Sequence, residues 1–486
     1  MRTVAIEIGK AGEGTVKTEL RENAVGLPGM LMQGIATIAP AFAILASFVF
    51  IVSKAGVVTP WAYLFGGALL ALQALNAAQL AKVFPSAGGW YTWIARTFHP
   101  RAGFFAGVLF SIWLPPVGAL TLSLLAKDVL EPSIKAEYGV TIPWWIWVAA
   151  GLALVIYFAY QGIALSERAL IITGTIEIVI MVALAFSGMA SPGPGGFSFA
   201  PLNPGNFGLG DNLFLGVVFS IFAFSGWEST GPLAEESKNP KRNVPIGLVG
   251  SVIVLMIYFV IVTWGYLVGI GVDKTGSIPT ATAFPVATLA QRVWGGAWVF
   301  LLFALLNSAI AVSIACFNGG TRTWYAMGRS GVLPTALGKV YPKRKTPINA
   351  IHLEVGVQVI AFVCILIWGA DDVFFSWANA ITIGLVLMYV LANIGVVKYY
   401  LTEGRAQFNP LLHVVVPVVA TAAGVVVVYY SYFNPFTSTG TVFYGLMVFI
   451  AVLAITILAL VYMRIRRQEE WMHKAQLVFE ESGGGH

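Results

Sequence analysis

The chain consists largely of apolar runs of about 18–25 residues, and these runs constrain its fold more than any other feature. An α-helix of about 20 residues spans the hydrocarbon core of a bilayer, so each run is long enough to cross it. Only 10% of the 486 residues are charged, against about 25% in a typical soluble protein. The runs lack the alternating pattern of outer-membrane β-barrels. We therefore predict an all-α membrane protein with twelve transmembrane helices, at 27–53, 58–81, 102–126, 143–165, 169–190, 212–234, 246–270, 293–318, 348–368, 373–400, 410–432 and 440–463.

The lysines and arginines are distributed unevenly between the connections of these spans. With the N-terminus in the cytosol, five of the 28 fall on the external side and the others on the cytosolic side. The positive-inside rule expects this asymmetry. We therefore predict a plasma-membrane protein with both termini in the cytosol. Its net charge of +6 reflects topology and anionic membrane lipids, not nucleic-acid binding. The five external residues are Lys54, Lys127, Lys135, Lys274 and Arg292.

Two of the spans are interrupted by residues that break helices. Pro40 stands among small residues in the first span, and Ser225-Gly226 interrupts the sixth. Five spans separate the two positions, and an odd number makes the second unit inverted relative to the first. Broken helices in corresponding positions of inverted halves indicate the substrate site of a secondary transporter. The predicted units are a tail at 1–26, a first repeat at 27–190, a second repeat at 212–400, accessory helices at 410–463 and a tail at 464–486.

Unwound backbone at these interruptions offers two half-sites for a ligand. Near Ile38–Phe42, N–H groups without intrahelical partners can receive a carboxylate, aided by the dipole of the following half-helix. Near Phe222–Gly226, freed carbonyls can accept hydrogen bonds from an ammonium group. Thr37 and Ser225 could add hydroxyl contacts, and Phe222 either closes over a ligand as a gate or simply packs in the core. A zwitterionic α-amino acid fits this pair of half-sites.

Two acidic residues, Glu177 and Glu228, lie deep in apolar spans. A charged side chain at mid-bilayer costs about 2.5–3.5 kcal/mol, so each must face the bundle interior, pair with a partner or carry a proton. Both are therefore candidate proton-coupling residues. The alternative is a carboxyl group that hydrogen-bonds an unwound backbone segment and has no part in transport.

Several other chemistries find no support in the chain. There is no Gly-x-x-x-x-Gly-Lys-Ser/Thr loop for ATP, no histidine pair at metal-ligand spacing on one helix and no Ser-His-Asp grouping. Cys316 and Cys364 lie in apolar spans, where cysteine packs as a small apolar residue. We therefore expect no enzyme activity, no metal and no cofactor.

Four stretches of the chain resemble those of a known family, the amino acid–polyamine–organocation transporters. They are GIATIAPAFAI (34–44), FPSAGGWYTWIARTF (84–98), AFSGWE with AEESKNPKRNVP (223–245), and TRTWYAMGRSGVLP with TPINAI (321–351). The resemblance covers about residues 24–400. It implies a leucine-transporter-like core of two inverted five-helix repeats and alternating access to a site near the membrane midplane.

The resemblance also implies roles for individual residues. The substrate carboxylate would meet the backbone at Pro40, Ala41 and Phe42, and the amine would meet carbonyls near Ile38, Phe222 and Ser225. Phe222 matches the aromatic gate of the family, and Cys316 falls where some members place a substrate-facing side chain. In one respect the chain departs from the family: Glu177 aligns with a lysine that stands in for a sodium ion in proton-coupled members. A carboxylate there could carry the proton, bind a cation or balance a positive substrate.

Our leading hypothesis is a secondary amino acid transporter, a proton-coupled importer rather than a sodium-coupled one, working as a monomer or homodimer. A polyamine or cationic amino acid exchanger is the alternative that Glu177 and Glu228 suggest. A membrane sensor that binds an amino acid without moving it is an alternative of another class, although the chain shows no sizeable soluble output domain.

Overall fold

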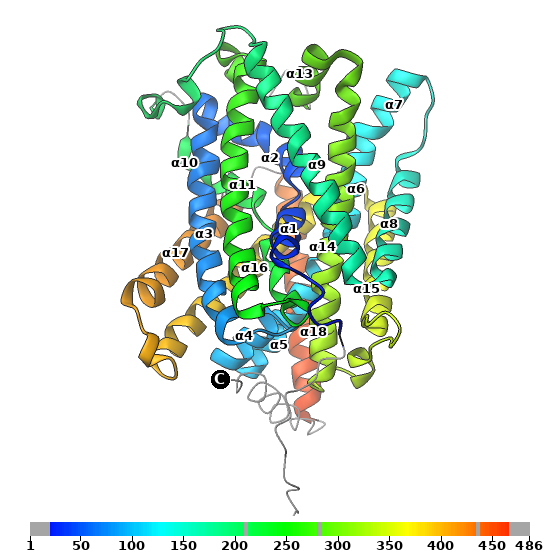
Figure 1. Cartoon of the computed structure of the whole chain (residues 1–486), viewed down its shortest axis with the longest axis vertical. Helices are drawn as coiled ribbons and strands as arrows, with labels where there is room; N and C mark the ends of the chain where they lie inside the picture. Colours follow the sequence, from blue (N-terminus) through cyan, green and yellow to red (C-terminus); the bar gives the residue numbers. More distant parts are fainter. Residues whose placement is uncertain (1–19, 209–211, 279–283, 434–437, 466–486) are drawn as a thin grey trace, which may run out of the picture.

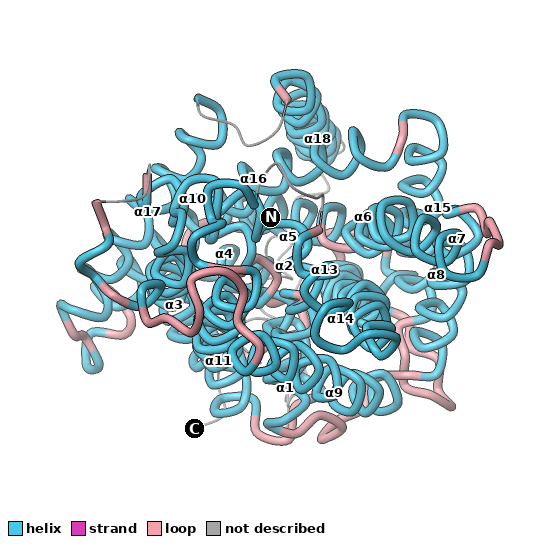
Figure 2. The backbone as a smooth tube through the Cα atoms, turned by 90° about the horizontal axis from the view of Figure 1, so that it is seen from above, coloured by secondary structure: helices cyan, strands magenta, loops and turns pink. Residues whose placement is uncertain are grey.

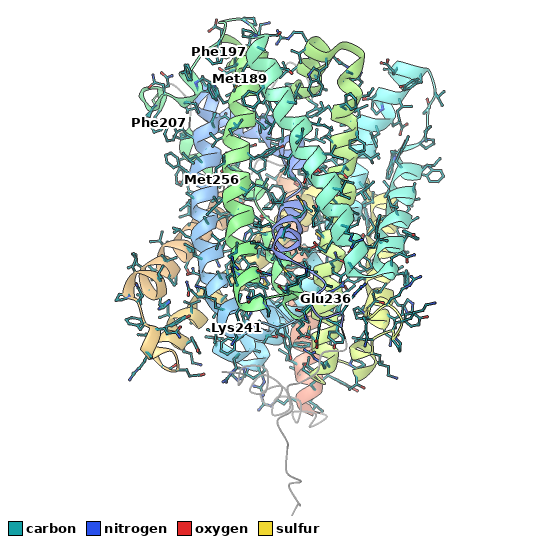
Figure 3. All side chains as sticks on the ribbon, viewed as in Figure 1. Met189, Phe197, Phe207, Glu236, Lys241 and Met256 are labelled. Atoms are coloured by element: carbon teal, nitrogen blue, oxygen red, sulfur yellow. The ribbon has the colours of Figure 1, made fainter. Side chains whose placement is uncertain are left out.

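The computed structural model describes residues 20–208, 212–278, 284–433 and 438–465. These residues fold into helices joined by short connections, and among them there is no β-strand beyond two isolated bridges. Most of the long helices run roughly along the vertical axis of Figure 1. Figure 3 places Glu236 and Lys241 toward one end of the molecule and Met189 and Phe197 near the other. The prediction of an all-helical protein is confirmed.

The principal helices follow one another along the chain. They are α1 (Leu27–Ile38), α2 (Pro40–Ala55), α3 (Thr59–Val83), α4 (Trp90–Thr97), α5 (Pro100–Trp113), α6 (Pro116–Leu125), α7 (Glu131–Tyr138), α8 (Trp144–Gln161), α9 (Ile163–Ala190), α10 (Leu213–Ala223), η5 (Trp227–Glu236), α11 (Pro240–Ile270), α13 (Pro285–Trp294), α14 (Val299–Arg329), α15 (Ile348–Trp368), α16 (Ala370–Leu401), α17 (Val416–Phe433) and α18 (Thr439–Ile465).

By length and composition, the described residues contain eleven segments that could cross a membrane. The first, Leu27–Val83, has 57 residues and contains α1, α2 and α3. Two of our predicted spans lie within it. A continuous helix of this length would measure about 85 Å, far more than the bilayer core of about 30 Å. The backbone departs from helical geometry at Gly56, which has a φ of 56° and a ψ of −133°. The count of twelve spans stays a prediction.

The residues at the two helix breaks, among them Ala39, Gly226 and Trp227, are buried in the bundle. In both views α1 lies beside α9, α11 and α14, and contacts between these helices agree with that placement. Figure 2 shows α17 and α18 at the edge, where they pack mainly on α16 and α3. The helices predicted as accessory are therefore peripheral, and the breaks are enclosed by the others.

An aromatic cluster holds the segment that follows the second break. The ring of Trp227 stacks on Tyr389, with centroids 5.8 Å apart, and packs edge-on against Trp90. The Trp90 indole also donates a hydrogen bond to the carbonyl oxygen of Glu228, at 3.3 Å. These buried rings hold the start of η5 against side chains of α4 and α16.

Candidate functional site

The first break lies between α1 and α2, at the place that Pro40 predicts. Helix α1 ends at Ile38, and Ala39 adopts the left-handed conformation, with a φ of 58° and a ψ of 72°. Helix α2 begins at Pro40. Proline has no N–H and disfavours helical geometry in the residue before it, which explains why the helix stops here. The interruption predicted in the first span is therefore confirmed.

The second break follows α10, which ends at Ala223. Gly226 has a φ of 130°, a conformation that residues with a side chain rarely adopt, and η5 begins at Trp227. A Cβ atom on Gly226 would lie 2.5 Å from the carbonyl oxygen of Thr37 and 2.9 Å from the nitrogen of Ile38. The end of α1 thus touches the second break, and only glycine permits this approach.

A cavity of about 90 Å³ lies where the two breaks meet. It is several-fold larger than the space of about 10–15 Å³ that one water molecule requires. Most of its lining is apolar, and none of the described residues that form it is charged. The lining residues are Thr37, Ile38, Ala39, Phe42, Ala43, Ala46, Leu114, Val117, Leu120, Thr121, Phe222, Ala223, Ser225, Gly226, Val312, Cys316, Phe374, Trp377, Ala378, Ile381 and Leu385.

Most of the residues predicted for substrate binding line this cavity, and four of the predicted site residues do not. The lining includes Thr37, Ile38, Phe42, Phe222, Ser225, Gly226 and Cys316. Outside it lie Pro40 and Ala41, together with both predicted proton-coupling residues, Glu177 and Glu228. The cavity therefore brings together residues from α1, α2, α10 and α14 that are far apart in the sequence.

Glu177 projects from α9 to the start of α2. Its Oε1 accepts a hydrogen bond from the Ala41 N–H at 2.9 Å, and its Oε2 accepts one from the amide of Asn307 at 2.8 Å. The neighbouring Ser308 hydroxyl accepts a hydrogen bond from the Phe42 N–H at 3.2 Å. The N–H groups expected to meet a substrate carboxylate are thus bonded to protein side chains, and Pro40 has none to offer. Burial of Glu177 is almost complete, at 1% exposure.

Glu228 lies at the second break in a different arrangement. Its Oε2 accepts a hydrogen bond from the Gly226 N–H at 2.7 Å, whereas no described residue bonds its Oε1. The Phe222 carbonyl, which we expected to be free, accepts a hydrogen bond from the Ser225 N–H at 3.2 Å. Glu228 is also fully buried, so one oxygen of a carboxyl group lacks a protein partner in the interior.

A buried polar cluster joins α1, η5 and α14 beside the cavity. The Gln33 amide donates to the Ala315 carbonyl at 2.8 Å and to the Ser229 hydroxyl at 3.1 Å. The Thr37 and Ser229 hydroxyls share a hydrogen bond of 2.6 Å. Our sequence reasoning missed Gln33 and Ser229. The sequence offered one signal for this cluster, the polar side chain of Gln33 inside an apolar run.

Ionic contacts hold the end of η5, and the sequence reasoning did not identify them either. Arg322 pairs with Glu236 at 2.8 Å, with both side chains buried, and Arg329 pairs with Glu235 at 2.5 Å. Glu167 is buried nearby, and no described residue hydrogen-bonds its carboxyl oxygens. Charged residues at the ends of apolar spans were the signal, but their pairing depends on contacts between distant helices.

Three known proteins that this chain resembles are named as an importer, a permease and a transporter. The low-affinity putrescine importer PlaP of Escherichia coli K12 is 25% identical over 407 residues, which cover 80% of this chain and 84% of the importer. The branched-chain amino acid permease BcaP of Lactococcus lactis is 25% identical, covering 71% of this chain and 75% of the permease. The chloroplastic cationic amino acid transporter 7 of Arabidopsis thaliana is 24% identical, covering 72% and 61%.

The match to a protein family extends over most of the chain. Residues 29–474 match the amino acid permease family, and this range includes both breaks and the cavity between them. With its many apolar helices, the chain is a multi-pass membrane protein. It belongs to the amino acid permease family, within the amino acid–polyamine–organocation transporters.

Proposed function

We propose that this protein is a secondary active transporter that carries an amino acid or a related amine by alternating access. The observation that carries the proposal is the meeting of two interrupted helices at one cavity, with Gly226 against the backbone of Thr37. Discontinuous helices in corresponding positions of two halves form the substrate site of many secondary transporters. The names of the relatives, an importer, a permease and a transporter, support transport over sensing alone.

The remaining predictions about architecture belong to the same proposal. Twelve spans arranged as inverted repeats at 27–190 and 212–400 would give the two breaks corresponding positions. The excess of Lys and Arg on one side supports a plasma-membrane protein with cytosolic termini.

We also propose that transport is coupled to protons, and that Glu228 is the better of the two candidate carriers. The contacts of Glu177 all come from donors, and donors suit a carboxylate that stays ionised. Glu228 has one oxygen without a protein partner, and it lies two residues from the cavity-lining Gly226. Binding or release of a proton there would alter the charge beside the cavity.

Uptake into proteoliposomes tests the transport function. Purified protein is reconstituted, and labelled amino acids, monoamines and polyamines are supplied with and without a pH gradient. We expect concentrative uptake of at least one of these solutes when the outside is acidic, and counterflow exchange without the gradient. Binding without counterflow would contradict transport, and uptake unaffected by pH would contradict proton coupling.

A polyamine or cationic amino acid exchanger is the second candidate. The putrescine importer and the cationic amino acid transporter among the relatives favour it, together with the carboxylates at the two breaks. The same panel distinguishes it, because an exchanger would require an internal amine for uptake and would not respond to the pH gradient alone.

A further inference from the structure

We propose that the cavity binds an amine that carries no carboxylate, and that Glu177 enforces this selectivity by occupying the N–H groups at the start of α2. The inference rests on the proposed transport function and concerns which solute is carried. It follows from the hydrogen-bond donors and acceptors that the described residues place around the cavity.

The cavity offers almost no donor to a carboxylate. A buried carboxylate requires positive charge or several hydrogen bonds, and no lysine, arginine or histidine is among the described lining residues. Among the lining side chains, only the Ser225 hydroxyl and the Cys316 thiol are donors for which the structure gives no hydrogen bond within the described protein. The other donors at the cavity bond to protein groups. The occupied donors are the Thr37 hydroxyl on Gln33, the Thr121 hydroxyl on Gly118, the Trp377 indole on Trp113, the Gly226 N–H on Glu228 and the Ser225 N–H on Phe222.

The first break would be the natural place for a carboxylate, but Glu177 already supplies one. Its Oε1 lies 2.9 Å from the Ala41 nitrogen, and Ser308 takes the next N–H, that of Phe42. Pro40 contributes no N–H. Because Glu177 is buried and also bonded to Asn307, a solute would have to displace a buried side chain held by hydrogen bonds to reach the same donors.

The same contacts leave acceptors for an ammonium group. In an uninterrupted helix the Ala41 N–H would bond the Thr37 carbonyl, and the Phe42 N–H would bond the Ile38 carbonyl. Both N–H groups bond side chains instead. Thr37 and Ile38 line the cavity, and they stand at the negative end of the α1 dipole. An ammonium has three donors and no acceptor, so it suits this end of the cavity.

The rest of the cavity suits an apolar body. Much of its lining consists of large apolar side chains, which include Leu114, Val117, Leu120, Val312, Phe374, Trp377 and Ile381. A second ammonium would be buried among these side chains without a carboxylate in the lining, which is costly. The chemistry therefore favours an alkyl or aryl monoamine over a diamine.

A matched set of solutes tests the inference on the full chain. Leucine, 3-methylbutylamine and 3-methylbutanoate share a branched apolar body and carry both charged groups, the amine alone or the carboxylate alone. Putrescine supplies a diamine. Binding is measured by thermal stabilisation in detergent, and transport by counterflow in proteoliposomes. We expect 3-methylbutylamine to bind at least about tenfold more tightly than the other three.

Two binding outcomes would overturn the inference. Leucine binding as tightly as 3-methylbutylamine would show that a carboxylate is accepted, and equal binding of putrescine would contradict the apolar-body part. The exchange measurements distinguish a failure of this inference from a failure of the proposed transport function. If leucine exchanges across the membrane and the monoamine does not, transport stands and the inference is wrong. If 3-methylbutylamine binds but no solute exchanges, the substrate inference stands and the transport proposal is wrong.

Two substitutions at one position test the role of Glu177. Glu177→Ala removes the group that occupies the Ala41 N–H, so leucine binding should strengthen by about tenfold. Glu177→Gln keeps an oxygen that accepts from Ala41, so leucine should still be excluded. Equal leucine affinity in the two variants would contradict the assignment. If Glu177→Ala does not fold, the solute series on the unmodified protein still decides the substrate class.

Discussion

The two helix breaks look alike in the sequence, but their polar groups are hydrogen-bonded differently in the structure. At the first break, between α1 and α2, both available N–H groups of the new helix are bonded to Glu177 and Ser308. At the second, between α10 and η5, the carboxyl group of Glu228 has one bonded oxygen and one without a described partner. A satisfied junction resists change, whereas an unsatisfied one can respond to a proton or a solute. We therefore expect the first break to stay rigid and the second to respond to a proton or a solute.

Filling the contact between the two helix breaks should have the largest effect on uptake. Gly226→Ala places a Cβ about 2.5 Å from the Thr37 carbonyl at a φ of 130°, so the backbone must shift. We expect uptake to fall by about 100-fold, because a displacement of about 1 Å in a functional site can have an effect of that size. Uptake and thermal unfolding are measured together. Gly356→Ala on α15 is the control, because nothing lies within 4 Å of its added Cβ; an equal loss there would contradict the reason given.

The ionic contacts at the end of η5 should give the largest effect on stability. Arg322→Met leaves Glu236 buried without its partner, and breaking such a pair costs about 3–5 kcal/mol. Arg329→Met removes a pair whose side chains are 20% and 13% exposed, so the loss of stability should be smaller. The measurement is unfolding in detergent by denaturant or heat. Equal losses would show that burial of the pair does not determine its contribution.

Replacing the carboxyl group at each helix break tests which of the two residues carries the proton. Glu228→Gln should reduce accumulation driven by a pH gradient by about tenfold, because its carboxyl group can no longer bind and release a proton. Glu177→Gln should reduce accumulation less, since its donors suit a carboxylate that stays ionised. Uptake with and without the gradient is compared in proteoliposomes, together with counterflow. A larger loss for Glu177→Gln would reverse the assignment of the two residues.

The smallest expected effect on stability concerns the hydroxyl at the first break. Ser308→Ala leaves the Phe42 N–H without its partner, which should lower the free energy of unfolding by about 1–3 kcal/mol. Ser313→Ala is a matched control on the same helix, because its hydroxyl only adds a bond to the Ala309 carbonyl four residues earlier. Both are measured by thermal unfolding, and similar values would show that the Phe42 contact adds nothing.

Much of the site could be predicted from the sequence, because helix breaks have local causes. Pro40 forbids a hydrogen bond whatever surrounds it, and Gly226 permits a conformation that other residues avoid. Both breaks were therefore found, along with several lining residues. The positions of Gln33 and Ser229 were missed, since a polar residue in an apolar run does not reveal its partner. The pairing of Arg322 with Glu236 likewise spans 86 residues.

The sequence by itself determined that the chain is helical and membrane-embedded, where its helices are interrupted, and that Glu177 and Glu228 lie in apolar surroundings. These properties depend on hydrophobicity and backbone chemistry, which act over a few neighbouring residues. Only the tertiary structure decided that Glu177 bonds the start of α2 while an oxygen of Glu228 has no described partner. Hydrogen bonds between distant helices depend on how those helices pack, and no local pattern contains that information.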